Sequence, residues 1–257
     1  MWYAIARGVL IPFFGTSAGA ACVFFLRRAV DPRLEKGLAG FAAGIMVSAS
    51  FFSLLRPALE YSAPLGRLAF LPATAGFLAG IAFLPVLDAL TPRLRPESGR
   101  VGCGLDRTGR LILAVTLHNL PEGVAVGVAY AGWFYGTAEV SLAGASALAV
   151  GVALQNFPEG AIVSLPLRAE GMGRWKAFLW GVLSGAVEPA GAVVTVFAAG
   201  FFLPLLPYLL SFAAGAMFFV TVEELIPAMS APPRSRLGPA AFALGFSLMM
   251  ALDVGLG

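Results

Sequence analysis

The amino-acid sequence predicts an all-α fold: a polytopic membrane protein with eight transmembrane helices, of which the two central ones are kinked by proline. Composition is the first reason, since 59% of the 257 residues are hydrophobic, only 12% are charged, and the mean hydropathy is +0.86. A soluble domain carries about twice that share of charged residues. The second reason is that apolar residues run in blocks of about twenty, the length that a helix needs to cross a bilayer. The connections between the blocks are short, so we expect one transmembrane domain over residues 1–257.

The predicted spans follow the apolar blocks in chain order. They cover residues 8–26, 37–55, 68–90, 111–134, 140–167, 177–202, 205–229 and 237–257. The longest polar connection, residues 91–110, contains four glycines and two prolines and is predicted to be a flexible loop. This loop has no histidine, which makes it a poor candidate for metal sensing.

Basic residues at the ends of the blocks set the predicted orientation, because Lys and Arg accumulate in cytoplasmic loops. The loops after the first, third, fifth and seventh spans hold 14 of the 17 basic residues, and residues 91–110 are one of these loops. The opposite side holds Arg7, Arg56 and Arg67. We therefore expect both termini outside the cytoplasm, in a prokaryotic plasma (inner) membrane. The net charge of +3 arises from these flanking residues, so the expected partner is the lipid bilayer and not nucleic acid.

Two motifs repeat each other inside the fourth and fifth predicted spans. They are Leu117-His118-Asn119-Leu120-Pro121-Glu122-Gly123 and Leu154-Gln155-Asn156-Phe157-Pro158-Glu159-Gly160. Each motif places a glutamate in an apolar segment, where a charge is costly and usually marks an ion or substrate pathway. The proline before each glutamate removes a helical hydrogen bond and leaves a backbone carbonyl without its usual partner. The repetition predicts a site built from two interrupted helices.

Acidic residues lie within or at the edge of several predicted spans. They are Asp88, Glu122, Glu159, Glu188, Glu223, Glu224 and Asp253, and none has a Lys or Arg in the interior of the same span. A buried carboxylate must be protonated, exposed to water or matched by a cation. A bound cation is the simplest way to balance several acids that gather in one place.

The side chains around the motif glutamates indicate which cation would bind. His118 and Glu122 are four residues apart and share a helix face, as do Gln155 and Glu159. Imidazole with carboxylates suits zinc and other borderline ions such as iron, manganese or cadmium, whereas calcium or magnesium would favour oxygen alone. His118 is the only histidine of the chain, and its place beside a membrane glutamate favours a ligand over a structural role.

Alternative roles stay open for several of these residues. Asn119 and Asn156 could serve only to hydrogen-bond across helices. Glu188 precedes a proline. It either lines the site or only hydrogen-bonds to backbone groups that the proline leaves without a helical partner. Glu223 and Glu224 are either interfacial anchors or an exit or relay site. Asp253 is a further possible exit or relay residue, and an interfacial role also stays open for it.

The same residues bear on other possible functions of the protein. An intramembrane metalloprotease typically needs a His-Glu-x-x-His helix, and a chain with a single histidine lacks it. A structural membrane protein has no need of so many acids without basic partners. A passive divalent-cation channel is the remaining alternative to a carrier. No enzyme activity is expected.

With its motifs in view, the sequence resembles the ZIP (Zrt/Irt-like) family of divalent-metal transporters, and its GufA-like branch in particular. Besides the repeated motifs, the resemblance rests on Ser184-Gly185-Ala186-Val187-Glu188-Pro189, Gly215-Ala216-Met217 and Glu223-Glu224-Leu225-Ile226-Pro227. The resemblance implies eight spans with both ends outside, and import of zinc or a related ion into the cytoplasm. The ion is the transported substrate, no prosthetic group is implied, and a homodimer is left open.

The resemblance also implies a metal site between the fourth and fifth spans, with a contribution from the sixth. The implied ligands are His118, Asn119, Glu122, Gln155, Asn156, Glu159 and Glu188. Some members carry a histidine at the position of Gln155 or an acid at that of Asn156. With neutral amides at both positions, a second metal is expected to bind weakly. Related sequences can also have a histidine where Glu223 stands.

Overall fold

The computed structural model describes residues 1–25, 31–90, 107–136, 140–169, 171–199, 203–233 and 235–256. Within these ranges every regular element is a helix and no strand occurs, which confirms the all-α prediction. The elements up to residue 90 are α1 (Trp2–Ala20), α2 (Cys22–Phe25), α3 (Pro32–Ala49), η1 (Ser50–Leu55), α4 (Arg56–Tyr61), η2 (Ala63–Leu68) and α5 (Phe70–Leu90). The two central helices are α6 (Arg107–Phe134) and α7 (Leu142–Ala169). The remaining elements are α8 (Arg174–Gly185), α9 (Val187–Ala199), η4 (Leu203–Leu205), α10 (Leu206–Val220), η5 (Thr221–Leu225), α11 (Ile226–Ser230) and α12 (Leu237–Leu256).

Six helical stretches in the described ranges are long and apolar enough to cross a membrane. They are Trp2–Phe25, Pro32–Tyr61, Leu142–Arg168, Arg174–Ala199, Leu206–Ser230 and Leu237–Gly255. A shorter apolar helix covers Phe70–Phe83. The chain is therefore a multi-pass membrane protein, while the count of eight spans stays a prediction.

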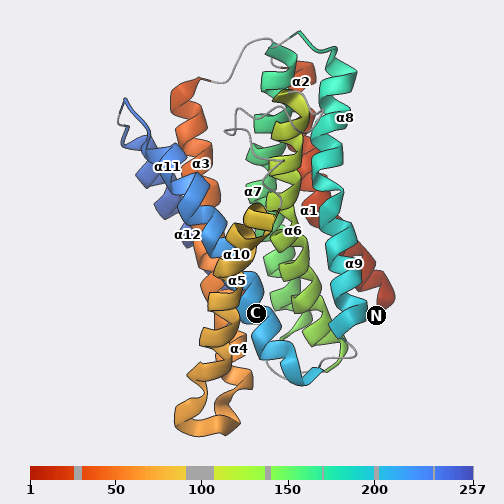
Figure 1. Cartoon of the computed structure of the whole chain (residues 1–257), viewed down its shortest axis with the longest axis vertical. Helices are drawn as coiled ribbons and strands as arrows, with labels where there is room; N and C mark the ends of the chain where they lie inside the picture. Colours follow the sequence, from red (N-terminus) through yellow and green to blue (C-terminus); the bar gives the residue numbers. More distant parts are fainter. Residues whose placement is uncertain are drawn as a thin grey trace.

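The helices run along the long axis of the molecule, with α1, α7, α8 and α9 on one side and α3, α11 and α12 on the other (Figure 1). Four helix pairs pack most extensively: α1 with α7, α3 with α12, α5 with α10, and α6 with α9. Glycines let the backbones of these pairs approach closely. A Cβ added to Gly44 of α3 would lie 2.1 Å from the carbonyl oxygen of Phe242 in α12. One added to Gly80 of α5 would lie 2.0 Å from that of Phe212 in α10. Small residues permit such close contacts between membrane helices.

The α3–α4 and α10–α11 stretches are each interrupted by a π-helical turn two residues before a proline. The turn η1 precedes Pro57, and the turn η5 precedes Pro227. Proline has no N–H for the carbonyl four residues earlier, and its ring crowds that carbonyl, so the preceding turn widens. Since α10 contacts η1 and α3 contacts η5, the two interrupted stretches pack against each other.

The central prolines behave differently. Pro121 lies inside α6, and Pro158 and Pro166 lie inside α7, and each of these helices continues for 28 residues. The predicted interruption of the two central helices is therefore not confirmed.

Candidate metal site

The two repeated motifs meet where α6 and α7 pack together, and α9 adds Glu188 to the same region. All the described polar side chains of this group are buried, with exposed fractions from 0% to 7%. They are Asn119, Glu122, Gln155, Asn156, Glu159 and Glu188, and we refer to them as the central cluster. Gln155 contacts Glu122 and Glu159, and its neighbour Asn156 contacts Glu188, so the three carboxylates lie in one polar region.

Gln155 joins the two motif glutamates. Its side-chain Nε2 donates hydrogen bonds to Oε1 of Glu122 and, at 3.4 Å, to Oε1 of Glu159. Because Gln155 and Glu159 are four residues apart on α7, they share a face of that helix, as the spacing predicts. A neutral amide thus bridges two acids that come from different helices.

Glu188 accepts hydrogen bonds on both of its carboxylate oxygens. Its Oε1 accepts from Thr16 Oγ1 at 2.8 Å and from Asn119 Nδ2 at 3.2 Å. Its Oε2 accepts from Asn156 Nδ2 at 2.8 Å. Asn119 Nδ2 also donates to the backbone oxygen of Ser184 at 3.3 Å. This carboxylate therefore links α1, α6 and α7 to α9.

The glycine that ends each motif explains how two further helices reach the cluster. A Cβ added to Gly123 would lie 2.4 Å from the backbone oxygen of Glu188. A Cβ added to Gly160 would lie 2.0 Å from the backbone oxygen of Thr16. Any larger residue would push α9 or α1 outward. The motif therefore supplies the acid and also the gap that admits a partner helix.

Several buried oxygens of the central cluster lack a hydrogen-bond partner among the described residues. They are Asn119 Oδ1, Glu122 Oε2, Gln155 Oε1 and Asn156 Oδ1. Each buried polar atom without a partner costs roughly 1–3 kcal/mol. Oxygens left without donors and gathered around carboxylates are the groups that a cation would coordinate.

The predicted site residues divide into four groups. The structure brings the six members of the central cluster together. The backbone of His118 lies in α6 one turn before Glu122, but its side chain lies outside the described part of the structure. Glu223 and Glu224 lie on η5 and are exposed, unlike the buried cluster. Asp253 lies near the end of α12 in a separate pocket.

The described residues hold no group of three His, Cys, Asp or Glu side chains with metal-binding geometry. Among the described side chains, a metal site would therefore combine amide oxygens with the carboxylates. Sequence reasoning missed Thr16, which is fully buried and donates to Glu188 across 172 positions of the chain. A threonine in an apolar block carries no local signal of this contact.

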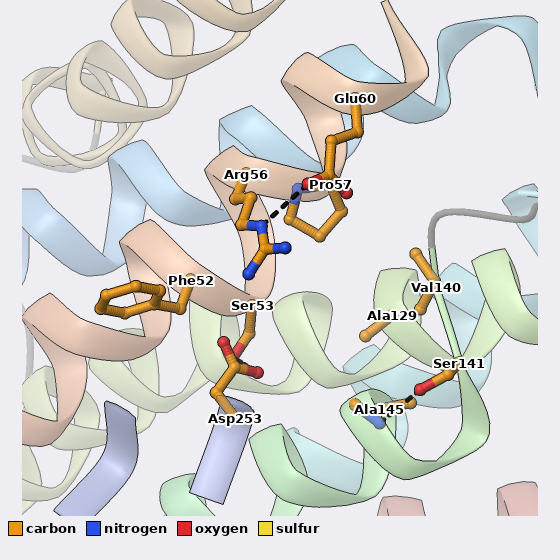
Figure 2. A pocket seen from close by; sticks show the side chains of 11 residues that line it. Phe52, Ser53, Arg56, Pro57, Glu60, Ala129, Val140, Ser141, Ala145 and Asp253 are labelled. Carbon is orange, nitrogen blue, oxygen red and sulfur yellow. Dashed lines mark hydrogen bonds and ion pairs between the residues drawn. The ribbon is translucent and has the colours of Figure 1, made fainter. Parts of the chain in front are cut away.

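The pocket that contains Asp253 has a volume of about 250 Å³ and lies between η1, α4, α6, α7 and α12. We call it the outer pocket. Ser53 Oγ donates to Asp253 Oδ1 at 3.0 Å, and Arg56 Nε lies 2.8 Å from Glu60 Oε1 (Figure 2). Ala129 of α6 and Ala145 of α7 form part of its wall.

An apolar layer separates the outer pocket from the central cluster. At 1.5 Å per residue, Ala129 lies about 10 Å along α6 from Glu122, and Ala145 lies about 15 Å along α7 from Gln155. Val126, Leu148 and Val152 fall between these positions at spacings that keep them on the same helix faces. All three are buried, with exposed fractions of 0% to 1%, and belong to one hydrophobic cluster.

Comparison with known proteins identifies the family. The family model described as ZIP Zinc transporter matches residues 104–253, more than half of the chain. Zinc transporter ZIP11 of Homo sapiens is 37% identical, and the alignment covers 94% of each chain. Zinc transporter ZIPB of Bordetella bronchiseptica is 36% identical over 99% of this chain and 82% of the relative. Zinc transporter GufA of Myxococcus xanthus is 36% identical over 95% of this chain and 96% of the relative. Each of these relatives is named a transporter, so the passive-channel alternative gains no support. Because the similarity extends over nearly the whole length, the chain belongs to the ZIP family, whose members are transporters and not enzymes.

Proposed function

We propose that this protein imports a divalent transition-metal cation into the cytoplasm, with zinc as the principal substrate and iron, manganese or cadmium as alternatives. The observation that carries the proposal is the set of buried oxygens without hydrogen-bond partners among the described residues of the central cluster. A doubly charged ion would be coordinated by these oxygens. It would also offset the mutual repulsion of the three glutamate carboxylates. The relatives named zinc transporters support zinc.

Among the described side chains of the central cluster, the atoms that could coordinate a metal are all oxygens. Oxygen ligands by themselves would suit calcium or magnesium. His118 is the residue that would shift the preference toward zinc, because imidazole nitrogen is a better ligand for borderline metals. We therefore assign His118 to the site together with the six described members. Glu223 and Glu224, in the second half of the seventh predicted span, would serve release toward the cytoplasm.

Eight spans with both termini outside would place the outer pocket on the extracellular side, and the whole chain would form a single transport domain. Large apolar side chains such as Phe14, Trp175 and Leu244 are exposed by 63%, 70% and 63%, as is expected of surfaces that contact lipid. The basic residues of the loops would orient the helices in a plasma membrane, with these apolar side chains toward the lipid. Asp253 would then lie on the side from which metal enters, not on the exit side.

The apolar layer between the outer pocket and the central cluster favours alternating access over an open pore. A hydrated divalent ion cannot cross buried valine and leucine side chains at acceptable cost. Movement of one group of transmembrane helices relative to another would open the path from the outer pocket to the central cluster and close the path on the opposite side of the cluster. Saturable uptake with a strong temperature dependence is expected of this mechanism, whereas near-linear flux would indicate a channel.

Metal uptake into proteoliposomes tests the proposal. The intact chain is compared with Glu122→Gln, which keeps the shape of the side chain and removes its charge, and with His118→Ala. A matched control is Glu35→Gln, since Glu35 is exposed near the beginning of α3. We expect both site variants to lose at least about tenfold in zinc uptake at low concentration, while the control stays near wild type. Undiminished uptake in both site variants would overturn the assignment of the site.

A further inference from the structure

Met249 of α12 occupies the apolar layer between the outer pocket and the central cluster. Its side chain is fully buried in the same hydrophobic cluster as the valine and leucine side chains of that layer. A Cβ added to Gly151 of α7 would lie 2.2 Å from Met249 Sδ and 3.1 Å from Met249 Cε. The missing side chain of Gly151 therefore leaves the space that the end of the Met249 side chain fills.

Helix spacing places the contact between Met249 and Gly151 one turn from each polar region. Asp253 of the outer pocket lies four residues after Met249 on α12, so the two side chains share a helix face. Gln155 of the central cluster lies four residues after Gly151 on α7, and these positions also share a face. Four residues span about 6 Å along a helix. A path along these faces from the outer pocket to the central cluster therefore passes the sulphur of Met249.

The same contact joins two helices that lie on different sides of the molecule. The helix α7 lies with α1, α8 and α9, whereas α12 lies with α3 and α11 (Figure 1). Movement of one group relative to the other would separate Met249 from Gly151. The sulphur would then face the opened path, because Asp253 on the same face of α12 already borders the outer pocket.

The sulphur of Met249 is also chemically distinct from its surroundings. In the described part of the chain Met249 Sδ takes part in no hydrogen bond, whereas the equally buried Met46 Sδ accepts one from Thr221 Oγ1 at 3.5 Å. Asp253 and Gln155, one turn away on either side, offer oxygen atoms. A thioether is a soft, polarizable ligand that suits zinc, whereas manganese prefers carboxylate and carbonyl oxygen.

We propose that Met249 is a specificity-determining residue for the transported ion: its thioether is a soft ligand that a partly dehydrated cation meets between the carboxylate of the outer pocket and the oxygens of the central cluster. An ion that bonds to sulphur crosses the apolar layer at a lower cost than an ion that binds oxygen alone. Zinc therefore passes more readily than manganese. This inference rests on the proposed transport of a divalent cation, and it adds a selection step before the ion reaches the central cluster.

The test replaces Met249 by leucine, which nearly keeps the volume and removes the sulphur, and by cysteine, which keeps a sulphur ligand. Met217→Leu is the matched control, since Met217 is equally buried but lies on α10. Proteoliposomes with the purified full chain are given zinc together with an excess of manganese, and the amounts taken up yield the ratio of the two kcat/KM values. Zinc affinity is measured by calorimetry, and thermal unfolding is followed in parallel.

We expect Met249→Leu to lower the ratio of zinc to manganese uptake by about threefold or more, because zinc loses a soft ligand that manganese does not use. Met249→Cys should raise the ratio above that of the leucine variant, and Met217→Leu should keep the wild-type ratio. The calorimetric affinity for zinc should stay at the wild-type value, since Met249 lies outside the central cluster.

An unchanged ratio in Met249→Leu would overturn the inference. An equal loss of zinc and manganese uptake would also overturn it, because that result would reduce Met249 to a packing role. The same holds if cysteine fails to raise the ratio. A wild type that neither binds nor transports zinc would refute the proposed function instead.

Discussion

The outer pocket and the central cluster both contain carboxylates, but they balance the negative charge in different ways. In the outer pocket Glu60 is paired with Arg56, and these side chains are 47% and 58% exposed (Figure 2). In the central cluster the described partners of Glu122 and Glu188 are neutral amide and hydroxyl groups in a buried setting. The pocket carries its own basic side chain, whereas under the proposed function the cluster would be balanced by a transported ion. This difference favours the cluster over the pocket as the proposed metal site.

The largest expected effect comes from closing the space between α1 and α7 beside the central cluster. In Gly160→Ala the new Cβ would lie 2.0 Å from the Thr16 backbone oxygen, so α1 must shift and the Thr16–Glu188 hydrogen bond should be lost. Overpacking of this kind typically costs about 1–3 kcal/mol, which should lower the thermal midpoint of unfolding. Zinc affinity should fall with it.

A matched substitution in the outer pocket controls for the loss of a glycine. A Cβ added to Gly144 would approach only Ser141 Oγ, at 3.3 Å. Gly144→Ala should therefore unfold close to the wild-type temperature and bind zinc as well as wild type. Equal effects of the two substitutions would remove the distinction between the regions.

Binding of metal should stabilise the protein through the central cluster. At a zinc concentration of about 100 times Kd, a ligand that binds only the folded state adds about 2.7 kcal/mol to the free energy of unfolding. The thermal midpoint should rise with zinc and return after removal of the ion by a chelator. Glu122→Gln should abolish most of the rise, while Asp253→Asn should retain it. A rise that depends on Asp253 and not on Glu122 would mean that the outer pocket is the main site.

Loss of charge in the outer pocket should have a smaller effect on uptake. Asp253 accepts a hydrogen bond from Ser53 and adds a negative charge to the pocket wall. Negative charge in a cleft raises the local concentration of cations. Asp253→Asn should raise KM for zinc by about two- to threefold at low ionic strength, with little change in kcat. High salt should reduce this difference, and a salt-independent loss of kcat would contradict a purely electrostatic role.

The smallest effect is expected at the ion pair of the outer pocket. Arg56 and Glu60 are four residues apart and partly exposed, and such surface pairs contribute at most about 1 kcal/mol. Arg56→Gln should therefore change the free energy of unfolding by less than about 1 kcal/mol. The initial rate of zinc uptake at low concentration should rise slightly, because a competing positive charge has been removed. A marked fall in the uptake rate would show that Arg56 has a role beyond charge balance.

Much of the central cluster could be predicted from the sequence. The sequence shows apolar blocks of helical length, glutamates inside those blocks, and the four-residue spacing of Gln155 and Glu159. Helix geometry is enough to predict from these local features which side chains share a helix face inside the membrane. The same reasoning expected the central prolines to interrupt their helices. However, Pro121 and Pro158 lie inside helices that continue on both sides, while the π-helical turns lie before Pro57 and Pro227.

The sequence by itself determined the membrane class and the acidic motifs, because composition and helical periodicity depend only on neighbouring residues. Only the tertiary structure decided that Thr16 reaches Glu188 and that Ser53 reaches Asp253, contacts that join positions 172 and 200 residues apart. Those contacts depend on how closely the helices approach, which Gly123 and Gly160 permit by presenting no side chain to α9 and α1. Interhelical distance is a property of the packed bundle, and no single helix encodes it.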